Sequence, residues 1–142
     1  MRITAPIQAE VAAWLEQEPG VRPVVWLGED TLTLFALDDS GKRVAFLFAY
    51  YREIPAPLGG ERECFIYVID VAESSRRCGI ASQLVQETIA RARQANVLQV
   101  SAYCDIHNES SHRLWLKNGF GISPVKQANG EILGSFVTSR LR

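Results

Sequence analysis

The residues best suited to binding an anion lie in one short segment near the middle of the chain. An apolar run at residues 64–71 is followed by the sequence A-E-S-S-R-R-C-G-I-A at residues 72–81. The run predicts a strand, and an amphipathic helix is predicted to begin at about Gly79. A strand that leads into a helix through a polar turn directs backbone N–H groups and the positive end of the helix dipole at one point. Arg76 and Arg77 add positive charge, and Gly79 allows close approach of the backbone, so the segment predicts a pyrophosphate site.

The spacing of this segment distinguishes it from other phosphate-binding loops. The chain contains neither G-x-x-x-x-G-K-[ST] nor G-x-G-x-x-G. It contains Arg76-x-x-Gly79-x-Ala81, which resembles the coenzyme A signature [QR]-x-x-G-x-[GA] of the GNAT superfamily of acyl-CoA-dependent N-acyltransferases. An ordinary strand–turn–helix with solvated arginines would also account for these six residues, so the hexapeptide alone leaves both interpretations open.

A second segment resembles a later motif of the same superfamily. Residues 108–120 read N-E-S-S-H-R-L-W-L-K-N-G-F, against the family pattern N-x-x-A-x-x-L-Y-x-K-x-G-F. Ser111 stands in place of the alanine, and Trp115 stands in place of the tyrosine. Asn108 is also a good N-cap, and Gly119 is placed to end the helix in the left-handed conformation. Two motifs in the family order, separated by a predicted helix and strand, favour membership over coincidence.

Within the superfamily, residues 63–81 most resemble the aminoglycoside 3-N-acetyltransferase branch. That branch reads E-I-Y-I-Y-D-L-A-V before R-R-x-G-I-A, and this chain keeps its first glutamate, its second tyrosine position at Tyr67 and the whole R-R-x-G-I-A string. The acidic residue that the branch places third before the valine is Val68 here. Asp70 lies two positions further on, and therefore on the same nominal face of the strand.

The resemblance implies where the coenzyme binds. The strands at residues 64–71 and 97–104 would lie side by side and splay apart, and acetyl-CoA, as co-substrate, would lie in the gap. The pantetheine arm would pair with the backbone near Ile69 and Val71. The resemblance assigns the pyrophosphate to Arg76, Arg77, Cys78, Gly79, Ile80 and Ala81, and it assigns the thiol end to Asn108, Ser111 and Trp115.

The acid and the base of the reaction are less directly indicated. Family members commonly use the motif tyrosine as the acid, but the indole N–H of Trp115 is too weakly acidic for that role. Tyr103 or Tyr67 protonates the departing thiolate, or the thiolate leaves unassisted. Asp70 or Tyr67 is the candidate that binds or deprotonates the amine. Two structural alternatives stay open: Asp70 as a cap of the turn at residues 74–76, and Tyr67 as a core aromatic.

These groups need a sheet and helices to position them, and the rest of the chain has the required pattern. Alternation and turn residues predict a mixed, mostly antiparallel twisted sheet of six to seven strands with helices on both faces, an α/β (α+β) architecture typical of the GNAT fold. Residues 2–4 are the one candidate for the first strand. The other predicted strands are residues 24–27, 31–37, 43–51, 64–71, 97–104, 120–125 and 132–137, and the predicted helices are a segment with Ile7, Val11, Trp14 and Leu15 on one face, residues 79–93 and residues 108–118.

The composition limits the class of protein. A chain of 142 residues fits one domain, residues 1–142, and its net charge of −1 without a block of basic residues argues against nucleic acid as a partner. No apolar run is long enough to span a bilayer, and the first residues lack the pattern of a signal peptide, so we expect a cytoplasmic protein. Three cysteines without C-x-x-C predict reduced thiols and no metal site. Dimers are frequent in the resembled fold, which allows a homodimer.

Three functions are compatible with these motifs. The first is transfer of an acetyl group from acetyl-CoA to a small primary amine. Four acidic residues expected near the acceptor, Glu53, Glu61, Glu63 and Asp70, favour a cationic amine. The second is a protein or peptide N-acetyltransferase, which needs an open groove, whereas residues 54–60 predict a flap. The third is a non-catalytic acyl-CoA-binding or sensing module, compatible with the substitutions at positions 68 and 115.

Overall fold

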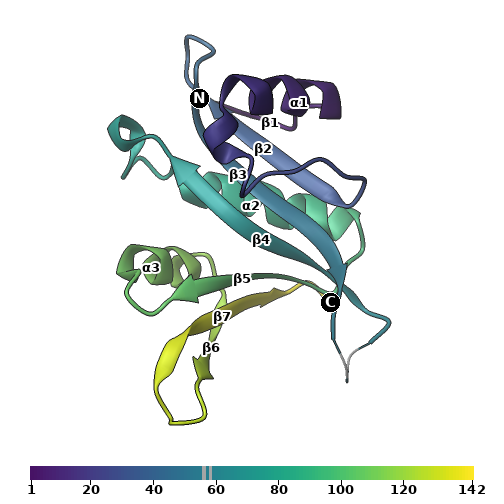
Figure 1. Ribbon diagram of the computed structural model, residues 1–142, viewed down its shortest axis with the longest axis vertical. Helices are drawn as coiled ribbons and strands as arrows, with labels where there is room; N and C mark the ends of the chain where they lie inside the picture. The colour runs from purple at the N-terminus through teal and green to yellow at the C-terminus, as the bar shows by residue number, and fades with distance from the viewer. Residues whose placement is uncertain (56, 58) are drawn as a thin grey trace.

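A twisted mixed sheet forms the centre of the computed structural model, which describes residues 1–55, 57 and 59–142 (Figure 1). In this part of the chain the sheet has seven strands in the order β1-β2-β3-β4-β5-β7-β6. The strands are β1 (Arg2–Thr4), β2 (Thr31–Leu37), β3 (Arg43–Glu53), β4 (Arg62–Val71), β5 (Gln99–Asp105), β6 (Gly121–Lys126) and β7 (Ile132–Arg140). The helices are α1 (Gln8–Gln17), α2 (Ile80–Gln94) and α3 (Glu109–Lys117), with single 3-10 turns η1 (Pro19–Val21) and η2 (Glu73–Ser75).

The strands β4 and β5 form the parallel pair of an otherwise antiparallel sheet. They pair over a short stretch, from Glu63 opposite Gln99 to Ile66 opposite Ala102. Beyond Ile66, β4 continues to Val71 paired with β3, while β5 follows β7 away from it (Figure 1). The predicted splay between these strands is therefore confirmed, and so is the mostly antiparallel sheet.

The splay begins at a β-bulge in β4. Phe48 of β3 pairs with Val68, but the next residue, Ala49, pairs with Ile66, so Tyr67 is an extra residue without a partner in β3. A bulge bends its strand and increases its twist. It also brings Tyr67 and Val68 toward the same face, because Val68 packs with the α1-side core and the Tyr67 ring contacts Tyr50 there.

The two faces of the sheet are covered by different helices, as predicted. On one face, α2 and α3 pack on the strands through a large apolar core that includes Leu84, Val85 and Trp115. On the other face, α1 packs through Val11, Trp14 and Leu15. The α1-side core is smaller, and its remaining buried members are Val25, Phe35, Phe46 and Phe48. Because α1 lies over β2 and β3, the same face of β4 and β5 is left uncovered by a helix (Figure 1).

The structure corrects two expected elements near the N-terminus. Residues 24–27 are not a strand: Val24 and Val25 close a turn by donating their N–H groups to the carbonyl of Val21, and this turn places Val25 in the core. Ile7 precedes α1 and is 66% exposed, so it does not belong to the apolar face of the helix. None of the described helices is long and apolar enough to cross a membrane.

Candidate functional site

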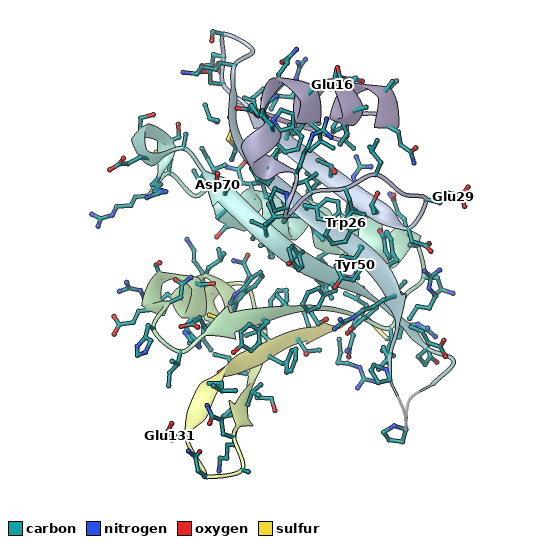
Figure 2. All side chains as sticks on the ribbon, viewed as in Figure 1. Glu16, Trp26, Glu29, Tyr50, Asp70 and Glu131 are labelled. Atoms are coloured by element: carbon teal, nitrogen blue, oxygen red, sulfur yellow. The ribbon has the colours of Figure 1, made fainter. Side chains whose placement is uncertain are left out.

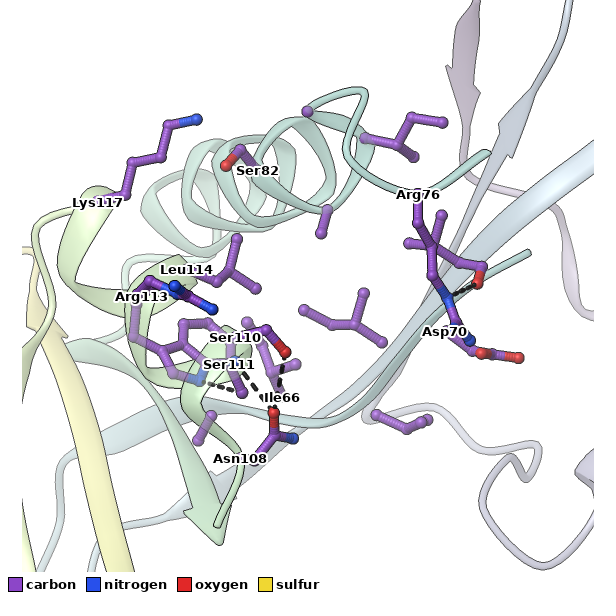
Figure 3. Close-up of a pocket in the computed structure, with 18 of the residues that line it drawn as sticks. Ile66, Asp70, Arg76, Ser82, Asn108, Ser110, Ser111, Arg113, Leu114 and Lys117 are labelled. Atoms are coloured by element: carbon purple, nitrogen blue, oxygen red, sulfur yellow. Dashed lines mark hydrogen bonds between the residues drawn. The ribbon is translucent and has the colours of Figure 1, made fainter. Parts of the chain in front are cut away.

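The splayed ends of β4 and β5 enclose an open cavity of about 800 Å³ (Figure 3). Its walls come from β4, the turn after it, the start of α2, the end of β5, and α3. The structure brings together every predicted site residue except Cys78 at this cavity. They are Tyr67, Ile69, Asp70, Val71, Arg76, Arg77, Gly79, Ile80, Ala81, Asn108, Ser111 and Trp115.

The turn between β4 and α2 has the geometry of an anion-binding nest. Arg77 and Gly79 both have left-handed backbone conformations, with φ of 64° and 77°, on either side of Cys78. The first helical hydrogen bond of α2 runs from Gln83 N to Gly79 O over 3.1 Å, so the N–H groups of residues 80–82 have no helical acceptor. Such alternating conformations direct successive N–H groups toward one point, and the helix dipole adds to their positive potential.

The two arginines of this turn have different roles. Arg76 is anchored, because its Nε donates to the carbonyl of Val71 over 3.0 Å at the end of β4. Both arginines line the cavity and are exposed. Cys78 lies between Arg77 and Gly79, but its thiol is directed at the carbonyl of Arg76, at 3.5 Å, and is not part of the cavity wall.

The wall opposite the turn is the first half of α3. Asn108 caps this helix, as predicted: its side chain accepts from the backbone N–H of Ser111 over 3.1 Å and from the hydroxyl of Ser110 over 3.2 Å. Trp115 is buried against Phe120, and its Nε1 donates to the Ser111 hydroxyl over 3.0 Å. The indole N–H therefore has its acceptor within the wall, and the Ser111 hydroxyl is left to donate into the cavity.

The charge on the cavity wall is strongly positive. Arg113 and Lys117, one turn apart on α3, join Arg76 and Arg77 as lining cations. Asp70 is the one carboxylate among the described lining residues, so four cations and one anion leave three net positive charges. The sequence reasoning missed Arg113, although its spacing of four from Lys117 places both on one helical face.

Tyr67 and Tyr103 lie on opposite walls of the cavity, one from each splayed strand. Tyr67 is 47% exposed and Tyr103 is 43% exposed, so neither is a core aromatic. The Tyr103 ring packs against Gly134 of β7, where a side chain would meet its hydroxyl at 2.5 Å. That one of these tyrosines is the acid or the base stays a prediction.

Asp70 is exposed at the cavity edge (Figure 3). Among the described residues its carboxylate has no hydrogen-bond partner. Asp70 does not cap the turn at residues 74–76, because other groups close it: Ser75 N donates to Ala72 O over 2.8 Å, and Arg76 N donates to Glu73 O over 3.3 Å. The position of Asp70 agrees with a role toward a ligand rather than with a turn cap.

Glu63 does not lie near the acceptor side of the cavity, where the sequence predicted it. It is 3% exposed and accepts from Arg52 (2.7 Å), Gln99 (2.8 Å) and Ser101 (2.7 Å). Burial alone would raise the pKa of Glu63, but the hydrogen bonds from Gln99, Ser101 and Arg52 and the charge of Arg52 outweigh it, and the pKa lies below its ordinary value. Glu63 is thus a satisfied, ionised group that joins β3, β4 and β5 where they still pair.

The structure also corrects the expected acidic acceptor side and its flap. Glu53 accepts from Gly60 N over 2.9 Å, and Glu61 pairs with Arg142 over 2.7 Å, at the end of β4 far from the turn (Figure 1). None of the described residues of the 54–60 segment lines the cavity, and Ala56 and Leu58 lie outside the described residues. Of the four acidic residues, Asp70 alone reaches the cavity.

Known acetyltransferases are similar to this chain in sequence. The model of the acetyltransferase (GNAT) family matches residues 5–120. An uncharacterized N-acetyltransferase of Bacillus subtilis (strain 168), YdgE, is 25% identical over 127 residues, which cover 87% of this chain and 78% of that protein. In the described part of the chain, no group of three or more His, Cys, Asp or Glu side chains could hold a metal ion.

Solved acetyltransferase structures are similar over nearly the whole chain. NAA60 of Arabidopsis thaliana, in complex with acetyl-CoA, has a TM-score of 0.73 at 14% identity, covering 99% of this chain and 98% of that one. An aminoglycoside 6'-N-acetyltransferase complexed with coenzyme A has a TM-score of 0.70 at 15% identity, covering 99% and 97%. Likeness at such identities establishes the fold, and it confirms the GNAT fold expected from the motifs.

Proposed function

Because the chain belongs to the acetyltransferase (GNAT) family and is an N-acetyltransferase that uses acetyl-CoA, we propose that its acceptor is the primary amine of a small, cationic molecule. The observation that carries this proposal is the cavity between β4 and β5, which joins an anion nest to an accessible carboxylate and two accessible tyrosines.

The residues of the cavity fit the coenzyme. The N–H groups at the start of α2, with Arg76 and Arg77, suit the pyrophosphate, and the excess of positive charge suits a molecule that carries several phosphate charges. Beyond Ile66 the β5-facing side of β4 has no partner strand, which leaves backbone groups there for the pantetheine arm. Asn108, Ser111 and Trp115 form the opposite wall.

In the proposed reaction the neutral amine nitrogen attacks the thioester carbonyl. A C–N bond forms, the C–S bond breaks, and the extra proton of the nitrogen must leave while the thiolate is released. Asp70 or Tyr67 takes the amine proton, directly or through water. Trp115 has no acidic proton, so Tyr103 or Tyr67 protonates the thiolate, or it leaves unassisted, since thiol pKa values lie at about 8.5. Holding both reactants in the cavity supplies much of the rate.

The choice of a cationic acceptor rests on Asp70 and on the exposed aromatic rings beside it. An exposed carboxylate and ring faces both attract an ammonium group. The likeness of residues 63–81 to the aminoglycoside 3-N-acetyltransferase branch supports the same class, and an aminoglycoside 6'-N-acetyltransferase is among the similar structures.

A peptide acceptor is the second candidate, because no described residue of the 54–60 segment covers the cavity. The third, a non-catalytic acyl-CoA-binding module, would keep the nest without transferring the acetyl group.

One assay separates these functions. Purified protein is incubated with acetyl-CoA and either cationic amines, neutral amines or short peptides with free N-termini, and the acetylated product is detected by mass spectrometry. Thiol reagents are unsuitable as the main readout, because Cys78 is exposed and free. We expect acetylated cationic amines. Acetylation of peptides alone would support the second candidate, and coenzyme binding with no acetylated product would support the third.

A further inference from the structure

Three aromatic side chains, two exposed and one half-buried, form a contiguous surface on the α1 side of β3 and β4, which we term the ring surface. Its members are Trp26, Tyr50 and Tyr67, with ring centroids 5.3 Å (Trp26–Tyr50), 5.5 Å (Trp26–Tyr67) and 6.2 Å (Tyr50–Tyr67) apart. Trp26 is 39% exposed and Tyr67 is 47% exposed. Trp26 and Tyr50 lie on the same open face as Asp70, which is further along β4 (Figure 2). Single exposed aromatics are common, but contiguous ones need an explanation.

Trp26 is held in place although it lies outside a helix or strand. Its ring packs edge-on against Phe48, a fully buried residue, with centroids 4.5 Å apart. The segment that carries it is fixed at Gly28, whose carbonyl accepts from Gln8 Nε2 over 3.1 Å and from Thr31 Oγ1 over 2.7 Å. The Phe48 contact and the hydrogen bonds at Gly28 therefore hold the indole in one position, with part of its surface exposed to solvent.

The ring surface is continuous with the reaction site. Tyr67 belongs both to this surface and to the cavity wall. At the other end, Arg52 already lies over the neighbouring Phe65 ring, with its Cζ 4.0 Å from the centroid, and over Tyr50 at 6.0 Å. The charge of Arg52 is balanced by Glu63. Among the described residues, no cation lies over Trp26 or Tyr67, at the end that faces Asp70.

We propose that the ring faces of Trp26 and Tyr67 bind a second, protonated amino group of the acceptor, so that the acceptor is a diamine or oligoamine, while Asp70 stays available to the reacting amino group. This inference rests on the proposed function. One amino group must be neutral to attack the thioester, whereas another, with a pKa of about 10, stays charged. A charged ammonium is attracted to the indole face most strongly among the aromatic side chains. Trp26 is thus a specificity-determining residue.

The test compares α,ω-diaminoalkanes with amino alcohols of the same length, whose tails are neutral. In the wild-type protein we expect KM to be about tenfold lower for the diamines, which converts to about 1.4 kcal/mol. Trp26→Leu should remove most of this preference by raising KM for the diamines, with kcat little changed. Trp26→Phe retains a ring and should keep part of the preference. Tyr67 is not used, because it is also a candidate acid or base.

Leu27→Ala is the matched control, since Leu27 is adjacent and 45% exposed but carries no ring. It should keep the preference for diamines. If the wild type acetylates both series with equal KM, or Trp26→Leu retains the full preference, the inference is overturned while the proposed function stands. If no amine is acetylated although acetyl-CoA binds, the proposed function fails and the inference fails with it.

Discussion

At the scale of single residues, Asp70 and Glu63 are carboxylates of one strand with opposite surroundings. Asp70 is exposed at the cavity and unpaired among the described residues, whereas Glu63 is buried with three donors. The first is therefore free to interact with the acceptor, and the second stabilises the pairing of β3, β4 and β5. Their substitutions should affect different properties of the protein.

Asp70→Asn should lower kcat/KM for the amine about a hundredfold, because it removes a base and a counter-charge without changing the size of the side chain. The affinity for acetyl-CoA should hardly change, as measured by calorimetry. Glu73→Gln is the control, since it removes an equal charge from the neighbouring turn outside the cavity wall. Equal losses in both variants would mean that general electrostatics, rather than Asp70, is responsible.

Glu63→Gln should lower the free energy of unfolding by about 1.5–2 kcal/mol at neutral pH, because it weakens the charged hydrogen bonds with Arg52, Gln99 and Ser101 while Arg52 itself stays partly solvated. The pKa of Glu63 is lowered in the folded state, so its contribution to stability is complete above the unfolded value. That contribution is lost as the pH falls through the folded value. In urea titrations from about pH 7 down to about pH 3, the difference between wild type and variant should therefore shrink, and a constant difference would contradict this role.

At the scale of elements, we expect the turn between β4 and α2 to bind the coenzyme through its backbone conformation as much as through its arginines. Gly79 has φ of 77° and open space where a side chain would stand. Gly79→Ala should therefore cost about 1–2 kcal/mol of stability through backbone strain rather than through a clash. It should also weaken acetyl-CoA binding, because relief of that strain redirects the N–H groups of the nest.

Gly20→Ala is the control for this change, because Gly20 also has open space around it but no left-handed conformation. Its stability and its coenzyme affinity should match those of the wild type. Thermal unfolding and calorimetry of the two variants give the comparison. Unchanged stability and affinity in Gly79→Ala would remove the nest from the explanation of coenzyme binding.

Local signals in the sequence predicted these elements well. The strand–turn–helix at residues 64–94 and the Asn108 cap are determined by residues close to one another in the chain, so the local sequence was enough to predict them. The bulge at Tyr67 could not be predicted, because one extra residue in a strand has no distinct local pattern. Glu63 was misplaced for another reason: its partners Gln99 and Ser101 are 36 and 38 residues away. The position of Trp26 likewise depends on contacts with β3.

At the scale of the whole molecule, the three cysteines report how tightly the sheet and helices pack. Cys78 is exposed, whereas Cys64 and Cys104 are buried. Burial, with the nearby charge of Glu63, raises the pKa of the Cys64 thiol to about 12. A thiol reagent at about pH 8 should therefore modify Cys78 alone in the folded protein, and all three after denaturation. Fast reaction of a second thiol without denaturant would show that the core opens readily.

The order of the strands in the sheet creates the gap between β4 and β5. That acetyl-CoA binds in this gap is tested most directly by titrating acetyl-CoA into the intact protein in a calorimeter. We expect binding of one molecule per chain, weakened about tenfold or more when Arg76 and Arg77 are both replaced by glutamine. We also expect binding to weaken as the salt concentration rises. Folded protein that gives no heat with acetyl-CoA, or equal affinity in the double variant, would contradict a nest built from this turn.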